Sequence, residues 1–275
     1  MDFEIKKLSD IGTSNPIIAR LSIQTNDLVR MFPLTDKKKE DIFDLFGMKV
    51  SDRLVSCFKI YSKLKIELNK VNQTDKDEYF TTNAVYTPSV IDLRYMCESF
   101  LYEAKSTLRD ILGIFDIFYN KKFTEAHYNK AYEWAKDKFG EDDCLTKMLK
   151  VDHNSWIQEI VFKRNAVEHP GGRSGYIYID DIKLISKENP PYFDAPKWYR
   201  NDDKASPIHA DMAVFIENTL ELCEDILVIL LEKLPKKGLP LVIVEIPPEQ
   251  RDVDCPVRLK VSLHSDYIQQ LESKH

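Results

Sequence analysis

Two long stretches of the chain repeat apolar residues every three to four positions. They lie within residues 36–71 and 89–118. The first repeat consists of Phe43, Phe46, Val50, Leu54, Phe58, Tyr61, Leu64, Leu68 and Val71. The second consists of Leu93, Cys97, Phe100, Ala104, Leu108, Ile111, Phe115 and Phe118. Because this spacing places the side chains on one face of a helix, the sequence predicts two long helices that form the spine of a bundle.

Shorter predicted helices and strands surround these two. Three further helices are predicted at residues 17–31, 124–140 and 206–234, the second with Thr124 as its N-cap. Turn residues between short apolar runs predict a β-hairpin at residues 175–186, and three prolines predict an extended loop at residues 189–204. Two last strands are predicted at residues 241–246 and 257–263.

The predicted fold class is therefore mainly α, a helical bundle with long antiparallel helices and a small C-terminal β element. The strands are too few to form a sheet core of their own. We assign residues 1–235 to the bundle, which includes the hairpin, and residues 236–275 to a small β appendage packed on it.

Composition narrows the class of protein. The chain has 275 residues, of which 43% are hydrophobic and 31% charged, as in an ordinary soluble globular protein. A net charge of −6 argues against a general nucleic-acid coat protein, although it leaves room for a local basic groove.

Other patterns bear on localisation and cofactors. The N-terminal MDFEIKKLSD has no apolar core of a secretory signal, and the longest aliphatic run, residues 226–231, is too short to span a membrane. Five scattered cysteines without a CxxC pair favour reduced thiols in a cytoplasmic protein. The histidines show no ligand spacing, so neither a metal site nor a cofactor is predicted.

The segment SWIQEIVFKRNAVEHPGGRSG, residues 155–175, carries the most informative polar residues. Ser155 and Gln158 form a capping-box pattern that predicts a helix start near Trp156, and Pro170 predicts its end near His169. Five apolar residues form a stripe along this helix: Trp156, Ile157, Ile160, Val161 and Val167.

Arg164 is predicted to project into the middle of that stripe, where a guanidinium is costly unless an anion meets it. Asn165 and His169 are four residues apart, so they share a face beside Arg164. Arg173 follows in a Gly-rich turn, residues 171–175. Arginine, asparagine and histidine near one turn are a plausible set of groups for handling a phosphodiester.

These residues resemble the HEPN superfamily, compact helical bundles marked by an R-x(4–6)-H motif that often has a polar residue after the arginine. Here the motif reads Arg-Asn-Ala-Val-Glu-His, residues 164–169. The resemblance covers about residues 89–172. It implies a metal-independent ribonuclease, frequently a toxin or defence effector, whose homodimer brings two motifs together into one site. RNA and an antitoxin protein are the further partners it implies.

The chemistry assigns each motif residue a role. An RNA 2′-hydroxyl attacks the adjacent phosphate and expels the 5′-oxygen, while His169 moves protons. Arg164 holds the non-bridging oxygens because its planar fork matches a phosphate. Asn165 orients the imidazole or donates to the phosphate. The candidate substrate-binding residues are Arg173, Lys163 and Glu103.

Other interpretations remain open at this stage. Arg164 can pair with Glu98, Glu103 or Asp110 and so fix helix register, with His169 as a C-terminal cap only. The bundle would then be a non-catalytic RNA- or protein-binding scaffold. A third interpretation is a helical nucleotide- or small-ligand-binding protein that uses Arg164 and the Gly-rich turn. Arg258 and His264 also match the bare pattern, but on a predicted strand, where we assign them no role.

Overall fold

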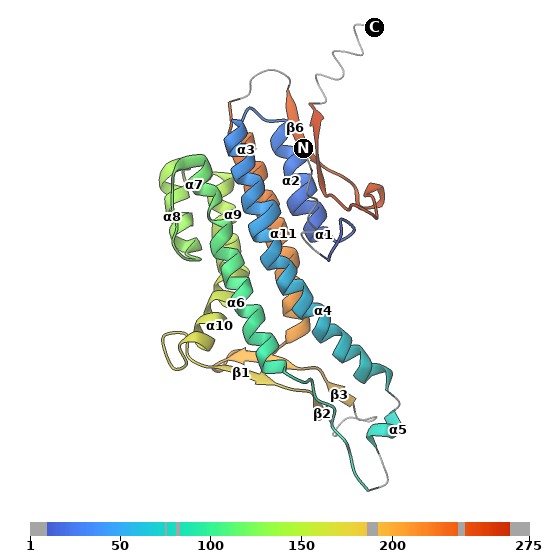
Figure 1. Cartoon of the computed structure of the whole chain (residues 1–275). Coiled ribbons are helices and arrows are strands. Elements are labelled where there is room, and N and C mark those ends of the chain that lie inside the picture. The colour runs from blue at the N-terminus through green and yellow to red at the C-terminus, as the bar shows by residue number, and fades with distance from the viewer. Residues whose placement is uncertain (1–9, 75, 81–82, 186–191, 236–239, 265–275) are drawn as a thin grey trace, which may run out of the picture. The chain divides into compact units, whose positions relative to one another are not determined.

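The computed structural model describes residues 10–74, 76–80, 83–185, 192–235 and 240–264, and it is mainly α-helical with small antiparallel sheets (Figure 1). The helices are α1 (Pro16–Ile18), α2 (Thr25–Arg30), α3 (Asp36–Phe43), α4 (Ser51–Gln73), α5 (Lys76–Tyr79), α6 (Leu93–Ile111), α7 (Ile114–Tyr119), α8 (Tyr128–Phe139), α9 (Cys144–Asp152), α10 (Gln158–Glu168) and α11 (Ile208–Glu232). The predicted fold class is confirmed. No described helix has the length and apolar character needed to cross a bilayer.

In the described part of the chain, three π-helical segments join consecutive α-helices into longer ones. They are η1 (Ala19–Gln24), η2 (Asp44–Val50) and η3 (His153–Ile157). The helix predicted at residues 36–71 therefore exists as the continuous run α3–η2–α4, with Thr35 as its N-cap. The helix predicted from Thr124 begins later, at Tyr128, and ends at Gly140, whose φ of +95° suits glycine.

The strands pair differently from the prediction. Strands β1 (Ile177–Asp180) and β2 (Lys183–Ile185) exist but do not form a hairpin with each other. β1 pairs antiparallel with β4 (Lys197–Arg200), which also pairs with β5 (Ser206–Pro207), and β2 pairs with β3 (Tyr192–Asp194). Part of the predicted 189–204 loop is thus strand. The C-terminal strands β6 (Leu241–Glu245) and β7 (Leu259–Leu263) pair with each other, at nearly the predicted positions.

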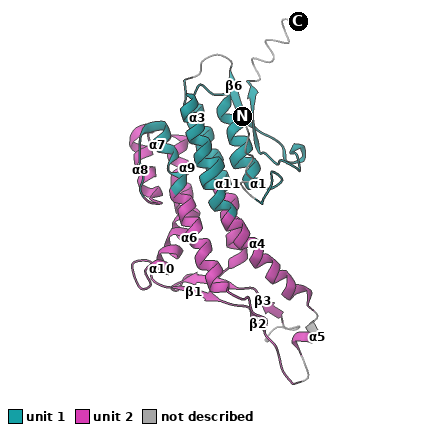
Figure 2. Ribbon diagram, viewed as in Figure 1, with its two compact units in different colours: residues 1–55, 110–124, 220–275 teal, residues 56–109, 125–219 magenta. Residues whose placement is uncertain are grey.

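The chain forms two compact units, each built from separate segments of sequence (Figure 2). Unit 1 comprises residues 1–55, 110–124 and 220–275, and unit 2 comprises residues 56–109 and 125–219. Strands β6 and β7 belong to unit 1, with the N-terminal helices. The boundary proposed near residue 235 stays a prediction.

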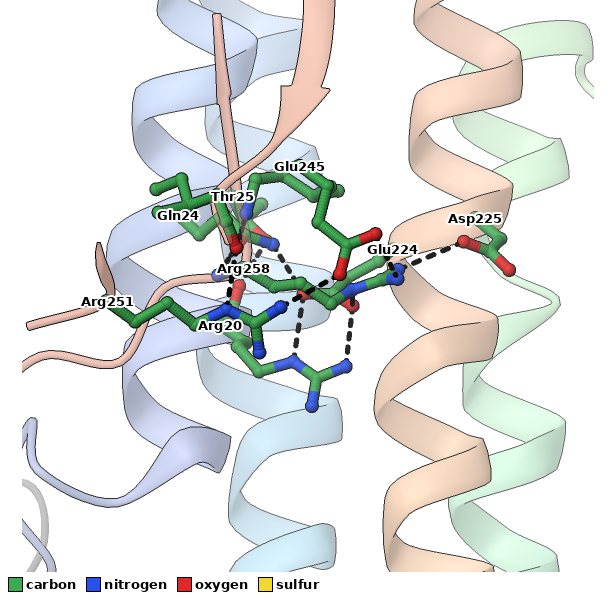
Figure 3. A network of polar contacts seen from close by, with 10 residues as sticks. Arg20, Gln24, Thr25, Glu224, Asp225, Glu245, Arg251 and Arg258 are labelled. Atoms are coloured by element: carbon green, nitrogen blue, oxygen red, sulfur yellow. Dashed lines mark hydrogen bonds and ion pairs between the residues drawn. The ribbon is translucent and has the colours of Figure 1, made fainter. Parts of the chain in front are cut away.

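A buried carboxylate organises unit 1 (Figure 3). The Glu224 side chain accepts hydrogen bonds from Arg20 Nε at 2.9 Å and Nη2 at 2.6 Å, and from Gln24 Nε2 at 2.6 Å. Arg258 of the C-terminal segment donates from Nε at 2.6 Å to the same carboxylate. Gln24 Oε1 in turn accepts from the backbone N–H groups of Arg258 and Leu259. The sequence pattern gave no indication of this role for Arg258.

Candidate functional site

The segment that carries the motif is a continuous helix in unit 2, from α9 through η3 to α10. The predicted helix start near Trp156, with Ser155 as its cap, is wrong, because Ser155 lies inside η3 and its Oγ donates to the backbone oxygen of Val151 at 2.8 Å. The predicted end is confirmed. His169 leaves the helical conformation with φ −132° and ψ 71°, and Gly171 follows with φ +76°.

The cation buried most deeply on α10 is Lys163, its side chain only 4% exposed. Its Nζ lies 2.6 Å from Glu159, 3.2 Å from Asp211 and 4.9 Å from the centre of the Trp198 ring. Asp211 also accepts hydrogen bonds from Trp198 Nε1 and Ser206 Oγ. Lys163 is thus held by groups of its own unit, an arrangement that suits a packing role better than the substrate-binding role expected for it.

Arg164 is partly buried, with 13% of its side chain exposed. Its Nη1 lies 3.3 Å from Glu168 one turn later, and its guanidinium carbon lies 5.4 Å from the centre of the Tyr102 ring on α6. It lines a small cavity, called here the first cavity, with a volume of about 160 Å³. The lining consists of Tyr102, Lys105, Ser106, Arg109, Glu125, Arg164 and Glu168.

Asn165 lines a different and larger cavity of about 510 Å³, called here the second cavity. Its lining consists of Lys105, Glu125, Ala126, His127, Asn129, His153, Gln158, Val161, Phe162, Asn165 and Arg173. Lys105 of α6 and Glu125 line both cavities. Lys105 Nζ donates to Asn165 Oδ1 at 2.9 Å and lies 3.7 Å from Glu168. One lysine of α6 thus contacts α10 at both Asn165 and Glu168.

The remaining expected site residues lie outside these cavities. His169 is exposed at the end of α10 and belongs to the lining of neither cavity. Glu103 is half-buried on α6 and also lines neither, and its backbone oxygen accepts from Thr107 Oγ1 at 2.8 Å. The structure therefore brings Asn165 and Arg173 to one cavity and Arg164 to another, with His169 at the surface beyond.

Two histidines that sequence reasoning set aside line the second cavity. His127 is the N-cap residue of α8, and its side chain makes no capping hydrogen bond. His153 lies in η3, and its Nδ1 is buried without a hydrogen-bond partner among the described residues. Burial lowers the pKa of His153, so its imidazole is neutral at neutral pH. Their separation in sequence, and the absence of any regular spacing, left no signal by which to group them.

Metal ligands do not gather in the described part of the chain: no three His, Cys, Asp or Glu side chains are close enough to hold an ion. Comparisons with family models, with curated proteins and with solved structures found no match to this chain. The function is therefore inferred from the geometry of these residues and from the motif that they carry.

Proposed function

We propose that this protein is a HEPN-like, metal-independent endoribonuclease, a toxin or defence effector that binds RNA beside the C-terminal end of α10. The observation that carries the proposal is the position of Arg164 and Asn165. These adjacent residues line two cavities that share Lys105, so cationic and amide groups surround this part of the helix. The expected partners are RNA, a second copy of the chain and an antitoxin protein. Five free cysteines suit the reducing cytoplasm.

The reaction needs two proton transfers and stabilisation of charge. The ribose 2′-oxygen bonds to the adjacent phosphorus as its proton passes to a base, and the bond from phosphorus to the 5′-oxygen breaks as an acid protonates that oxygen. The products are a cyclic phosphate and a 5′-hydroxyl. Arg164 donates to the non-bridging oxygens. To do so it exchanges Glu168 for the phosphate, a change that the half-exposed Glu168 carboxylate allows.

His169 is the proton carrier in this scheme, because an imidazole can both accept and donate a proton and this one is exposed. One histidine in the motif supplies one proton carrier per chain. A two-fold homodimer would bring a second His169 to the same phosphate and complete the acid–base pair. Exposure of His169 at the surface is compatible with such a shared site.

The test is an RNA cleavage assay in EDTA with the parent protein and the variants His169→Ala and Arg164→Ala. Loss of the proton carrier is expected to slow cleavage by roughly 10²–10⁴-fold, and loss of the guanidinium by roughly 10²–10³-fold. Arg94→Ala is the matched control, because Arg94 forms an exposed ion pair with Glu98 on α6. Cleavage that survives both motif substitutions at the parent rate would refute the assigned site.

A second candidate function is RNA or protein binding without cleavage. It is favoured by the contacts of Arg164, which already has Glu168 and the Tyr102 ring as partners within its own unit. The same assay separates the two functions when binding is measured beside cleavage. A scaffold would bind RNA without producing cyclic phosphate ends, and His169→Ala would leave its affinity unchanged.

A further inference from the structure

We propose that the outer edge of strand β6 is an interaction surface for a second copy of the chain, whose own β6 pairs with it antiparallel. The pairing joins the two-stranded sheets of both copies into one, in the order β7–β6–β6–β7 about a two-fold axis. The inference goes beyond the proposed function, because this surface lies in unit 1 whereas the motif lies in unit 2. The pairing does not depend on cleavage of RNA.

The register of the β6–β7 hairpin shows which backbone groups of β6 face outward. Ile246 N–H donates to the Arg258 oxygen at 2.7 Å, so residue 246 and every second residue before it point their backbone groups towards β7. The backbone groups of Leu241, Ile243 and Glu245 alternate with these and point away from β7. In the part of the chain that the structure describes, no group forms a hydrogen bond with them. Such an open edge is a template for a further strand.

The opposite edge of the hairpin, on β7, is capped within the chain. Leu259 N–H points away from β6 and donates to Gln24 Oε1 at 2.6 Å, and Arg258 N–H donates to the same oxygen. β7 also packs against α2 and carries the exposed Lys260. A covering helix and a lysine are two devices that keep a strand edge from pairing with another chain. β6 has no lysine, and its outer backbone groups are unbonded among the described residues, so the hairpin is protected on one side only.

The side chains of β6 suit an interface better than a solvent-facing edge. Leu241, Val242, Ile243 and Val244 are all aliphatic and all partly exposed. Successive residues point to opposite faces of a strand, so apolar surface occurs on both faces of β6. A two-stranded hairpin is marginally stable by itself, and further strands stabilise it. The apolar surface continues onto the half-exposed Met31, which lines one cavity together with Leu241 and Ile243.

Self-complementarity favours a second copy over an unrelated strand. With Ile243 opposite Ile243 of the second copy, Leu241 lies opposite Glu245, and each outward N–H of one strand meets an outward oxygen of the other. The charges also fit, because the two Glu245 carboxylates are then four residues apart along the ladder, or about 14 Å. That separation exceeds the screening length of about 8–10 Å. Each Glu245 also keeps its own Arg251 at 2.8 Å, so no like charges meet.

Hydrogen exchange of the parent chain, followed by nuclear magnetic resonance at several protein concentrations, tests the pairing without any substitution. The amides of Leu241, Ile243 and Glu245 are expected to exchange at least tenfold more slowly in concentrated protein than in dilute, monomeric protein. The amides of Val242 and Val244 are the internal control, because they point towards β7 and should be protected at every concentration.

Three results of this measurement would overturn the proposal. The first is a parent that stays monomeric at the highest concentration, by light scattering. The second is fast exchange of the outward amides in a parent that is dimeric. The third is protection that persists in the monomer, because another segment of the same chain would then cover the edge.

Charge reversal at the two-fold axis is the second test, because Ile243 faces its own copy there. Ile243→Lys and Ile243→Glu are each expected to raise the dissociation constant of the dimer at least tenfold, since like charges replace a buried aliphatic pair. An equimolar mixture of the two variants should associate again, because opposite charges then meet. Val253→Lys, at an aliphatic residue that is 87% exposed in the same unit, should associate like the parent.

Circular dichroism and urea midpoints establish that the two Ile243 variants are folded. Folded variants that associate as tightly as the parent would refute the pairing, and so would folded variants whose mixture does not associate. The exchange measurement on the parent decides the matter if either variant fails to fold.

These outcomes are separable from those of the cleavage assay. Protection of the β6 edge that depends on concentration, in a chain that does not cut RNA, supports the interface and refutes the ribonuclease. Cleavage that depends on Arg164 and His169, in a chain whose outward β6 amides exchange freely at every concentration, supports the ribonuclease and refutes the inference.

Discussion

Lys163 and Arg164 are neighbours on α10 with the same charge but different surroundings. The Lys163 ammonium is buried between Glu159, Asp211 and the Trp198 ring, whereas Arg164 keeps a half-exposed partner in Glu168. A carboxylate that loses its cation costs more where other side chains enclose it, as they do Asp211, than where it is half exposed, as Glu168 is. We therefore expect substitution of Lys163 to reduce stability more than activity, and substitution of Arg164 to reduce activity more than stability.

We expect Lys163→Met to lower the free energy of unfolding by about 2–4 kcal/mol, because Asp211 loses a buried cation while its other hydrogen bonds remain. Arg164→Met is the matched control and should lower it by about 1 kcal/mol or less. Urea denaturation followed by circular dichroism measures both. Equal losses of unfolding free energy in the two variants would show that Lys163 contributes no more to stability than Arg164 does.

The burial of His153 predicts a pH dependence of stability. Burial lowers its pKa in the folded state, so below the unfolded pKa of about 6.5 the unfolded chain binds a proton that the folded chain does not. The stability that depends on a neutral His153 is therefore fully present above the unfolded pKa. It is lost as the pH falls through the pKa of His153 in the folded chain.

We therefore expect the parent to lose more stability than His153→Gln between pH 7 and pH 5, since glutamine does not titrate. Denaturant midpoints of both proteins across this interval give the measurement, and taking their difference cancels the carboxylates that the two share. A difference that does not change with pH would contradict the burial of a neutral imidazole.

At the scale of elements, the turn that joins α10 to β1 is tightly constrained. Gly175 has φ +73°, and a Cβ placed there would lie 2.0 Å from Asn201 Oδ1. Asn201 itself accepts from the backbone N–H of Tyr176 through its side chain and donates its own N–H to the Tyr176 oxygen. This pair of contacts closes the end of the β1–β4 ladder.

Gly175→Ala is expected to lower the free energy of unfolding by about 1–3 kcal/mol, through the strain of positive φ and the displacement of Asn201. Gly12→Ala makes a suitable comparison, because a Cβ there meets nothing within 4 Å. Thermal or chemical unfolding reports the loss. If Gly175→Ala were as stable as Gly12→Ala, the close approach of Asn201 would be wrong.

The helices could be predicted because their signals are local. Apolar spacing located α3–η2–α4 and α6, and the Pro-Gly-Gly run located the end of α10. Strand pairing could not be predicted, because it depends on contacts between residues far apart in sequence, such as that of buried Trp198 on β4 with Phe100 on α6. The pattern at Ser155 and Gln158 failed as a start signal because η3 continues the preceding helix, so the capping interaction is never needed.

The site was predictable only in part, for a related reason. The phase of α10 determines which cation is buried, and the sequence assigned the interior to Arg164 when Lys163 occupies it. Asn165 and Arg173 do line one cavity, as their positions near the turn suggested. That cavity is also lined by Lys105, His127 and His153, which come from other elements. Which elements pack side by side depends on helix packing, and a single sequence does not specify it.

For the whole molecule, the proposed shared site predicts a homodimer. Light scattering after size exclusion should give the mass of two chains, because one His169 per chain cannot serve as both acid and base in the scheme above. Mixing Arg164→Ala with His169→Ala chains should not restore the parent rate, because a mixed dimer still holds only one His169. A monomer that cleaves RNA at the full rate would rule out the shared site.

The Glu224 cluster has a consequence for the biosynthesis of unit 1. Arg20 leaves the ribosome 204 residues before the carboxylate it bonds, and Arg258 emerges 34 residues after that carboxylate. Until Glu224 emerges, a nascent chain holds Arg20 and Gln24 without the carboxylate that they bind, and until Arg258 emerges that carboxylate lacks a second arginine. Unit 1 therefore completes its core only after translation has passed residue 258.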